Sequence, residues 1–325
     1  MKLPKWMKFV GFHAEYLGQP SKYEVVYVDS LDFEYYEDLV RNTDRDIIFW
    51  KNGEICDYIE FEKIIDSLHK ENSSKKFVCI FNDYRKFKTP YTYIPSLGWW
   101  GNVLSSNWSK IEDIKNISNT HKRQKLFISR NRIGKDHRRQ WVSFLRQNDL
   151  FDRGYVSVGW ENKFIENTNE TYLLNPILKN IPYNKPAHSD YNLLPYYEDV
   201  FTEVVTESGC NPNGTNPFGH FDSEKVWRPF MMCVIPMIIT YPNYDNYLKD
   251  VGFDMFDDVI DTSFYSETDI DNKIKIINRN FEVIQSELVT DGRFKDSVWE
   301  RLKKNQEKFL NYDNYYKYIR ENLND

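Results

Sequence analysis

Lys125–Val158 reads KLFISRNRIGKDHRRQWVSFLRQNDLFDRGYVSV. The apolar runs at its two ends, KLFIS and GYVSV, have the length of buried strands. Between them Trp141, Val142 and Leu145 recur at the spacing of a helix, for which Asp136 is the expected N-cap. A strand, a helix and a second strand in succession form a βαβ unit, which predicts a parallel sheet.

The same alternation continues on both sides of this stretch, so the whole chain is predicted to be α/β. A restart near residue 120 predicts two domains, 1–120 and 121–325, whereas residues 86–108 have no period and are predicted to be irregular. Ser223 and Asp269 are expected N-caps, and Pro229 is expected to kink or split its helix. Strands are predicted at residues 24–28, 46–50, 75–81, 201–206 and 236–240, and helices at residues 61–69, from 224, from 269 (with Ile277, Phe281, Ile284 and Leu288 on one face) and at 298–310.

The composition is that of a folded protein without a strongly basic surface. Aromatic residues make up 17% of the 325 residues, which excludes intrinsic disorder. The 43 Lys and Arg against 49 Asp and Glu give a net charge of −6, which excludes a nucleic-acid footprint at the level of the whole chain.

The cysteines and the apolar runs exclude several other classes. The four cysteines follow neither CxxC nor Cys/His spacing, so no zinc site or disulfide framework is predicted. The first residues lack the apolar core of a signal peptide, and the longest apolar run, residues 230–239, is too short to span a bilayer. We expect a cytoplasmic protein.

A basic turn follows the strand at Lys125–Ser129. It carries Arg130, Arg132 and Lys135 and leads into His137 and two further arginines. In a parallel sheet this turn faces the ligand crevice, where a helix N-terminus and arginines together favour a diphosphate. The alternative is a solvated basic face, which is at least as good an interpretation for Arg138 and Arg139.

Two carboxylates are predicted to lie near the same crevice. Glu207 ends the strand at 201–206, and Glu224 opens the next helix beside Lys225. Carboxylates accept the hydroxyl hydrogen bonds of a ribose or another sugar, and Lys225 offers a point charge to a phosphate. Taken alone, each residue is better explained structurally, Glu224 as an acid favoured in a first helical turn and Glu207 as a surface residue.

Residues 126–265 resemble the nucleotide-binding half of GT-B glycosyltransferases, in particular the fucosyltransferase and exostosin-like groups and glycosyltransferases of phages and bacteria. The resemblance covers about 140 of the 325 residues and follows an ordered series of pieces. It implies two Rossmann-like domains that face a cleft, the first binding the acceptor and the second the nucleotide sugar, with a C-terminal helix packing back on the first. The matching pieces are LFISRNRIGKDHRR, VVTES, SEKVWRPF, VIPMIIT and Gly252-Phe253.

The resemblance also implies roles for single residues. Glu224 would contact the ribose, Lys225 and Arg130 the diphosphate, with Arg132 and Lys135 nearby, and Glu207 the donor sugar or its surroundings. For a reaction that inverts the anomeric centre, a base is required; Asp83 and His13 are the candidates in the first half, together with Asp29, and Glu207 is a further candidate in the second. Aspartates at strand ends are also common turn residues.

No metal and no cofactor are predicted. An Asp-x-Asp pair that binds a metal ion is expected directly after a strand, and neither Asp44-Arg45-Asp46 nor Asp269-Ile270-Asp271 has that position. The acceptor stays open between a glycan and a hydroxymethylated base of phage DNA, in a bacterial or an infected host cell; the acidic net charge speaks against DNA. The rival interpretation is a non-catalytic nucleotide-binding α/β protein.

Overall fold

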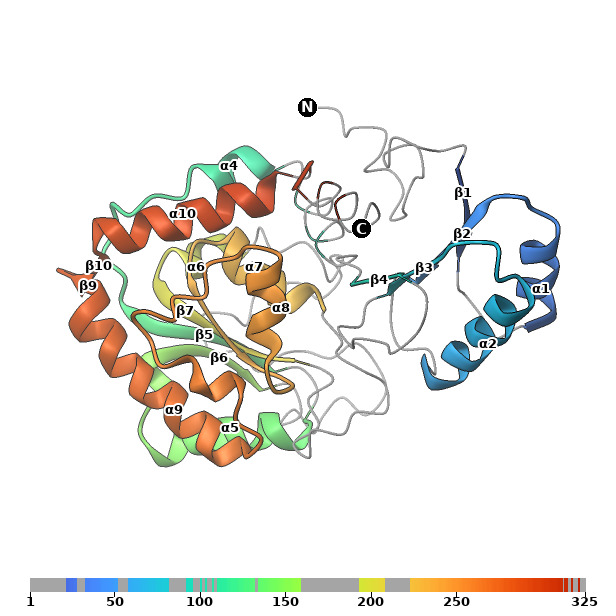
Figure 1. Ribbon diagram of the computed structural model, residues 1–325. Helices are drawn as coiled ribbons and strands as arrows, with labels where there is room; N and C mark the ends of the chain where they lie inside the picture. The colour runs from blue at the N-terminus through green and yellow to red at the C-terminus, as the bar shows by residue number, and fades with distance from the viewer. Residues whose placement is uncertain are drawn as a thin grey trace, which may run out of the picture. The chain divides into compact units, whose positions relative to one another are not determined.

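A computed structural model of the chain describes residues 22–27, 33–51, 58–81, 92–95, 110–131, 134–158, 193–207 and 223–311, with isolated positions between and after these ranges (Figure 1). Two compact units are present, Met1–Ser105 with residues 216–222 and 311–325, and Ser106–Thr215 with Ser223–Leu310. The second unit begins before residue 120 because α4 packs within it. There the Gln306 Nε2 donates a hydrogen bond of 2.9 Å to Ile114 O.

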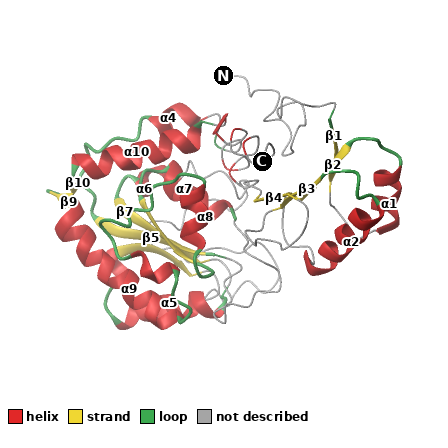
Figure 2. Ribbon diagram, viewed as in Figure 1, coloured by secondary structure: helices red, strands yellow, loops and turns green. Residues whose placement is uncertain are grey.

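The first unit contains a sheet of four parallel strands in chain order, β1-β2-β3-β4. Its helices lie on one face (Figure 2), as expected when each right-handed crossover moves in the same direction. The core between helices and sheet includes Tyr36, Phe49 and Phe77, whose rings are 5.6–6.2 Å apart. The described elements are β1 (Tyr23–Tyr27), α1 (Phe33–Arg41), β2 (Asp46–Lys51), α2 (Tyr58–Glu71), β3 (Phe77–Phe81) and β4 (Thr92–Pro95).

The second unit contains a parallel sheet of order β6-β5-β7-β8 with helices on both faces. On one face, Phe127 of β5 stacks on Phe281 of α9 at 5.0 Å, and Trp141 of α5 donates to Ser129 Oγ. α6 and α7 lie on the other face, with α10 and α4 packed outside them (Figure 1). The elements are α4 (Ile111–Lys115), β5 (Lys125–Asn131), α5 (Asp136–Gln147), η4 (Phe151–Arg153), β6 (Gly154–Val158), α6 (Leu194–Tyr197), β7 (Val200–Thr206), α7 (Glu224–Met231), β8 (Ile235–Ile239), α8 (Tyr244–Asp250), η8 (Thr262–Tyr265), α9 (Ile270–Val283), η9 (Ile284–Leu288), β9 (Val289–Thr290), β10 (Arg293–Phe294) and α10 (Asp296–Leu310).

The predicted parallel α/β architecture is confirmed, and so are two helix caps. Ser223 Oγ accepts from the Lys225 backbone N–H, and the Asp269 carboxylate accepts from that of Asn272. One expectation was wrong, because Asp136 is the first residue of α5, behind an N-cap at Lys135. Of the two outcomes expected at Pro229, a split is not seen, since α7 continues through Pro229 to Met231.

The predicted helix from Asp269 ends in a turn of a different kind. α9 is a regular α-helix as far as Val283, after which Ile284–Leu288 form a π-helical turn. Ile277, Phe281, Ile284 and Leu288 are all buried, so the apolar face continues through the change of helix type.

Candidate functional site

The order of the strands in the second sheet reverses at β5. The chain passes from β5 through α5 to β6 on one side, and β7 then pairs with β5 on the other side. In open α/β sheets a crevice for ligands forms where the strand order reverses, outside the carboxyl ends of the strands. Here the carboxyl ends of β5 and β7 lie at that position, together with the first turns of α5 and α7.

Glu207 joins the end of β7 to the start of α7. Its carboxylate is fully buried, and Oε2 accepts hydrogen bonds from Ser223 N at 3.2 Å and from Ser223 Oγ at 2.8 Å. A negative charge at this place is favoured by the unpaired N–H groups of the first helical turn. Glu207 therefore fixes how α7 begins, and its catalytic role stays a prediction.

Glu224 lies in the first turn of α7 between two cations. Its Oε1 is 3.0 Å from Lys225 Nζ and 3.4 Å from Arg228 Nη2, and its side chain is 14% exposed. Burial acts to raise the pKa of this carboxyl, but the charges of Arg228 and Lys225 outweigh burial and hold the pKa at about 2. Glu224 is consequently ionised at neutral pH and still reaches solvent.

The first turn of α5 is hydrogen-bonded to the end of β7 through two buried side chains. The Arg138 guanidinium donates twice to Thr206 O, at 2.8 and 3.2 Å, and His137 Nε2 lies 2.9 Å from Glu207 O. Both side chains are buried. The interpretation of Arg138 as a solvated basic face was wrong, whereas Arg139 is exposed and donates to Gly134 O.

His137 is held neutral by this environment. Burial is the main cause that lowers its pKa to about 4, and the neighbouring charge of Arg138 lowers the pKa further. A neutral imidazole can donate from Nε2 to the Glu207 carbonyl without placing a second charge beside Arg138. His137 thus stabilises the edge of the sheet through a neutral hydrogen bond.

Arg130 belongs to a buried polar cluster on the face covered by α6. Its Nη2 lies 3.2 Å from Tyr197 Oη and 3.4 Å from Glu203 Oε1, and Tyr197 donates to Glu203 Oε2 at 2.8 Å. Glu203 is 2% exposed, whereas the Arg130 side chain is 18% exposed. A diphosphate at this arginine would therefore share the guanidinium with Glu203.

The remaining predicted residues divide into two groups. Lys135 is the exposed N-cap residue of α5, with an extended backbone. His13, Asp29, Asp83 and Arg132 lie outside the described residues. Of the predicted set, the structure brings Glu207, Glu224 and Lys225 together at the start of α7. Arg130 is on β5, beside Tyr197 and Glu203.

Sequence reasoning missed Glu203, Tyr197 and the structural role of His137. A usable signal was present for Glu203, because it is the one charged residue in an otherwise uncharged strand, VFTEVVT. A charge in a strand that is buried on both faces requires a partner nearby. No local pattern indicates that Arg130 supplies it.

Gly252 has a structural reason to be glycine. Its N–H donates to Lys249 O at 2.7 Å and that of Phe253 to Leu248 O at 2.9 Å, which is the Schellman arrangement at the end of α8. The backbone φ of +88° is in the left-handed region, and a Cβ would lie 2.8 Å from Lys308 Nζ. The Gly252-Phe253 piece of the resemblance is thus explained by helix termination alone.

Among the described residues no group of three or more His, Cys, Asp and Glu side chains is arranged to hold a metal ion, and no helix is both long and apolar enough to cross a membrane. No family model matches the chain, and neither curated proteins nor solved structures gave a match.

Proposed function

We propose that the chain is a glycosyltransferase that moves a sugar from a nucleotide-sugar donor to a hydroxyl acceptor without a metal ion. In this reaction the acceptor oxygen forms a bond to the anomeric carbon while the bond from that carbon to the diphosphate breaks. The acceptor proton passes to a base, or to the leaving diphosphate, and nucleoside diphosphate is released.

One observation carries the proposal, namely the Glu224–Lys225 pair at the start of α7. The two side chains are partly exposed, carry opposite charges and lie at the carboxyl edge of a parallel sheet. An ionised carboxylate there suits two ribose hydroxyls, because it offers acceptors only. The adjacent ammonium suits a phosphate oxygen.

In this proposal Glu207 and Arg228 are positioning residues. Glu207 holds Ser223 and thereby the first turn of α7, and Arg228 keeps Glu224 ionised. Arg130, on β5, would also bind the diphosphate, and Glu203 and Tyr197 would orient its guanidinium. Positive charge from Lys225 and Arg130 would stabilise the leaving diphosphate in place of a metal ion.

The GT-B arrangement and the acceptor are part of the same proposal. The first unit would bind the acceptor across a cleft and supply the base, with Asp83 and His13 as candidates. A glycan is the acceptor that the composition favours, since the net charge of −6 opposes binding to DNA phosphates. A non-catalytic nucleotide-binding protein would retain the Glu224–Lys225 site but would not transfer the sugar.

Release of nucleoside diphosphate from a panel of nucleotide sugars tests for catalysis. With the matching donor and acceptor we expect turnover that is unchanged by EDTA, because lysine and arginine would neutralise the leaving group. Nucleotide binding without any turnover would favour the non-catalytic alternative. Loss of activity in EDTA and its recovery with Mn²⁺ would contradict the metal-free mechanism.

Substitutions at the start of α7 test the binding site itself. Glu224→Gln and Lys225→Gln should each weaken nucleoside diphosphate binding about tenfold, as expected from the loss of one charge-assisted hydrogen bond. Calorimetric titration measures the affinity, and thermal unfolding reports separately on the Glu224–Arg228 pair. Asp271→Asn, in the first turn of α9, is the matched control and should bind as the wild type does. Wild-type affinity in both α7 variants would refute the site.

A further inference from the structure

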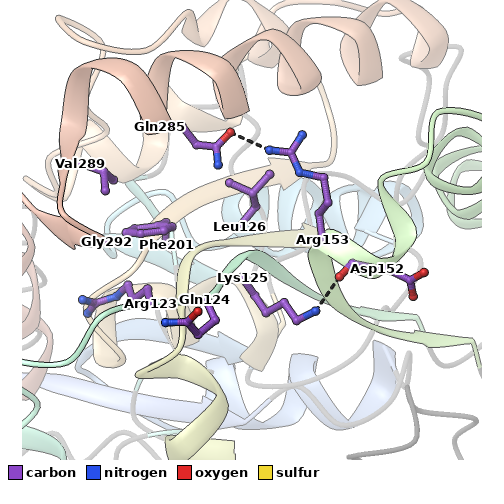
Figure 3. A pocket seen from close by; sticks show the side chains of 10 residues that line it. All are labelled: Arg123, Gln124, Lys125, Leu126, Asp152, Arg153, Phe201, Gln285, Val289 and Gly292. Carbon is purple, nitrogen blue, oxygen red and sulfur yellow. Dashed lines mark hydrogen bonds between the residues drawn. The ribbon is translucent and has the colours of Figure 1, made fainter.

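A second candidate site lies at the amino-terminal end of β5, an internal strand of the second sheet, opposite to the carboxyl ends described above. A cavity of about 390 Å³ opens there, between β5, η4 and the segment that follows α9 (Figure 3). Its volume is within the range of pockets that bind small molecules. The residues that line it are Arg123, Gln124, Lys125, Leu126, Asp152, Arg153, Phe201, Gln285, Val289 and Gly292.

The charge of this lining is positive, with three cations and one carboxylate, although the whole chain is acidic. Lys125 Nζ donates to the backbone oxygen of Asp152 at 2.6 Å, and Arg153 Nη2 donates to Gln285 Oε1 at 2.7 Å. Both acceptors are neutral, and neither cation has an ion pair with a carboxylate in the part of the chain that the structure describes. Figure 3 shows the Asp152 carboxylate directed away from Lys125.

Arg123 adds a buried positive charge to the same wall. It is 4% exposed and stacks over Phe294, with the ring centroid 4.7 Å from the guanidinium carbon. Its Nη2 is buried and has no hydrogen-bond acceptor among the described residues. Burial lowers the pKa of Arg123 to about 10, so the residue stays charged at neutral pH.

Part of the remaining wall is apolar, and part has an unusual backbone conformation. Leu126 and Phe201 are buried side chains at the cavity, so an apolar group could pack there. Gln285 belongs to the π-helical turn η9, and Val289 follows it directly. Such turns are rare and are found frequently at functional sites.

We propose that this cavity binds a small anion with an apolar body, of which a phosphate monoester is the simplest example. Lys125 and Arg153 hold the anionic oxygens, and Leu126 and Phe201 contact the apolar part. The site is separate from the start of α7. The seven residues of β5 span about 20 Å along the strand, from its amino end at the cavity to its carboxyl end near α7. It does not depend on the proposed transferase activity.

Phenyl phosphate is a probe that combines both halves of such a ligand. Calorimetric titration into the full chain should give saturable binding at one site, and benzyl alcohol and benzylamine should bind far more weakly. Arg153→Gln should weaken phenyl phosphate about tenfold, as expected for one charge-assisted hydrogen bond at a partly exposed site. Arg153 is exposed, so this variant should fold normally.

Two control variants locate the binding. Arg279→Gln removes an exposed arginine of α9 outside the cavity, and Lys225→Gln removes the cation at the opposite edge of the sheet. Neither should change the affinity for phenyl phosphate. The proposal is overturned by the absence of saturable binding, by equal affinity for benzylamine, by unchanged affinity in Arg153→Gln, or by loss of binding in Lys225→Gln alone.

Discussion

Acidification from pH 6.5 to pH 4 should lower the free energy of unfolding by about 3 kcal/mol through His137 alone. The folded state holds the pKa of this imidazole at about 4, because burial and the charge of Arg138 oppose its protonation, whereas its ordinary value is 6.5. Between these two pH values the unfolded chain binds a proton that the folded chain does not. Stability is therefore complete above pH 6.5 and decreases as the pH falls toward 4.

Urea unfolding at a series of pH values measures this loss. His137→Gln keeps a donor for the Glu207 carbonyl and does not titrate, so its stability should depend less on pH by the same 3 kcal/mol or so. Glu224 acts in a separate, lower range: its pKa is lowered from 4.5 to about 2, so its contribution is present above 4.5 and is lost toward pH 2. Parallel pH profiles for wild type and His137→Gln would rule out a buried neutral histidine.

Gly154→Ala should destabilise the second unit by about 3 kcal/mol, the upper end for an overpacked core. A Cβ on Gly154 would lie 2.5–2.7 Å from three ring atoms of Phe127. That ring is fully buried and cannot move away, since Phe281 stacks on it at 5.0 Å and Trp141 lies at 5.9 Å. Chemical unfolding of the variant measures the cost.

A second background makes this test specific. In Phe127→Leu the smaller side chain leaves room at β6, so adding Gly154→Ala should cost about 1 kcal/mol or less there, and the two substitutions should be non-additive. An equal cost of Gly154→Ala in both backgrounds would show that the backbone of β6, rather than the Phe127 ring, determines the effect.

The elements that sequence predicts well are those with a long or uniform pattern. β5 and α5 were predicted almost to the residue, since an apolar run and a helical stripe follow each other without interruption. β4 was missed because it has only four residues and contains Pro95, which is tolerated because β4 is the edge strand of its sheet. α1 was missed because it lies in an acidic segment where Tyr36 and Val40 alone are fully buried among the side chains that the structure describes.

The candidate site was predictable in position but not in its contacts. The carboxyl edge of the sheet follows from the order of strands and helices, and Ser223 identifies the start of α7. A run of basic residues looks the same whether it faces solvent or the carbonyl groups of another strand. That Arg138 binds Thr206 O and that Arg130 pairs with Glu203 depends on which strands are neighbours, which is a property of the tertiary fold.

The position of β5 inside its sheet also favours one order of assembly over another. Asn131 meets Ser157 of β6 across 26 positions of sequence, but meets Thr206 of β7 across 75. The first pairing closes a short loop around α5 and can form as a local unit, whereas the second must bring together parts of the chain that start far apart. We therefore expect β7 and β8 to join a β5–α5–β6 unit that has already formed, so that the carboxyl ends of the strands, where Glu207 lies, are completed late in folding.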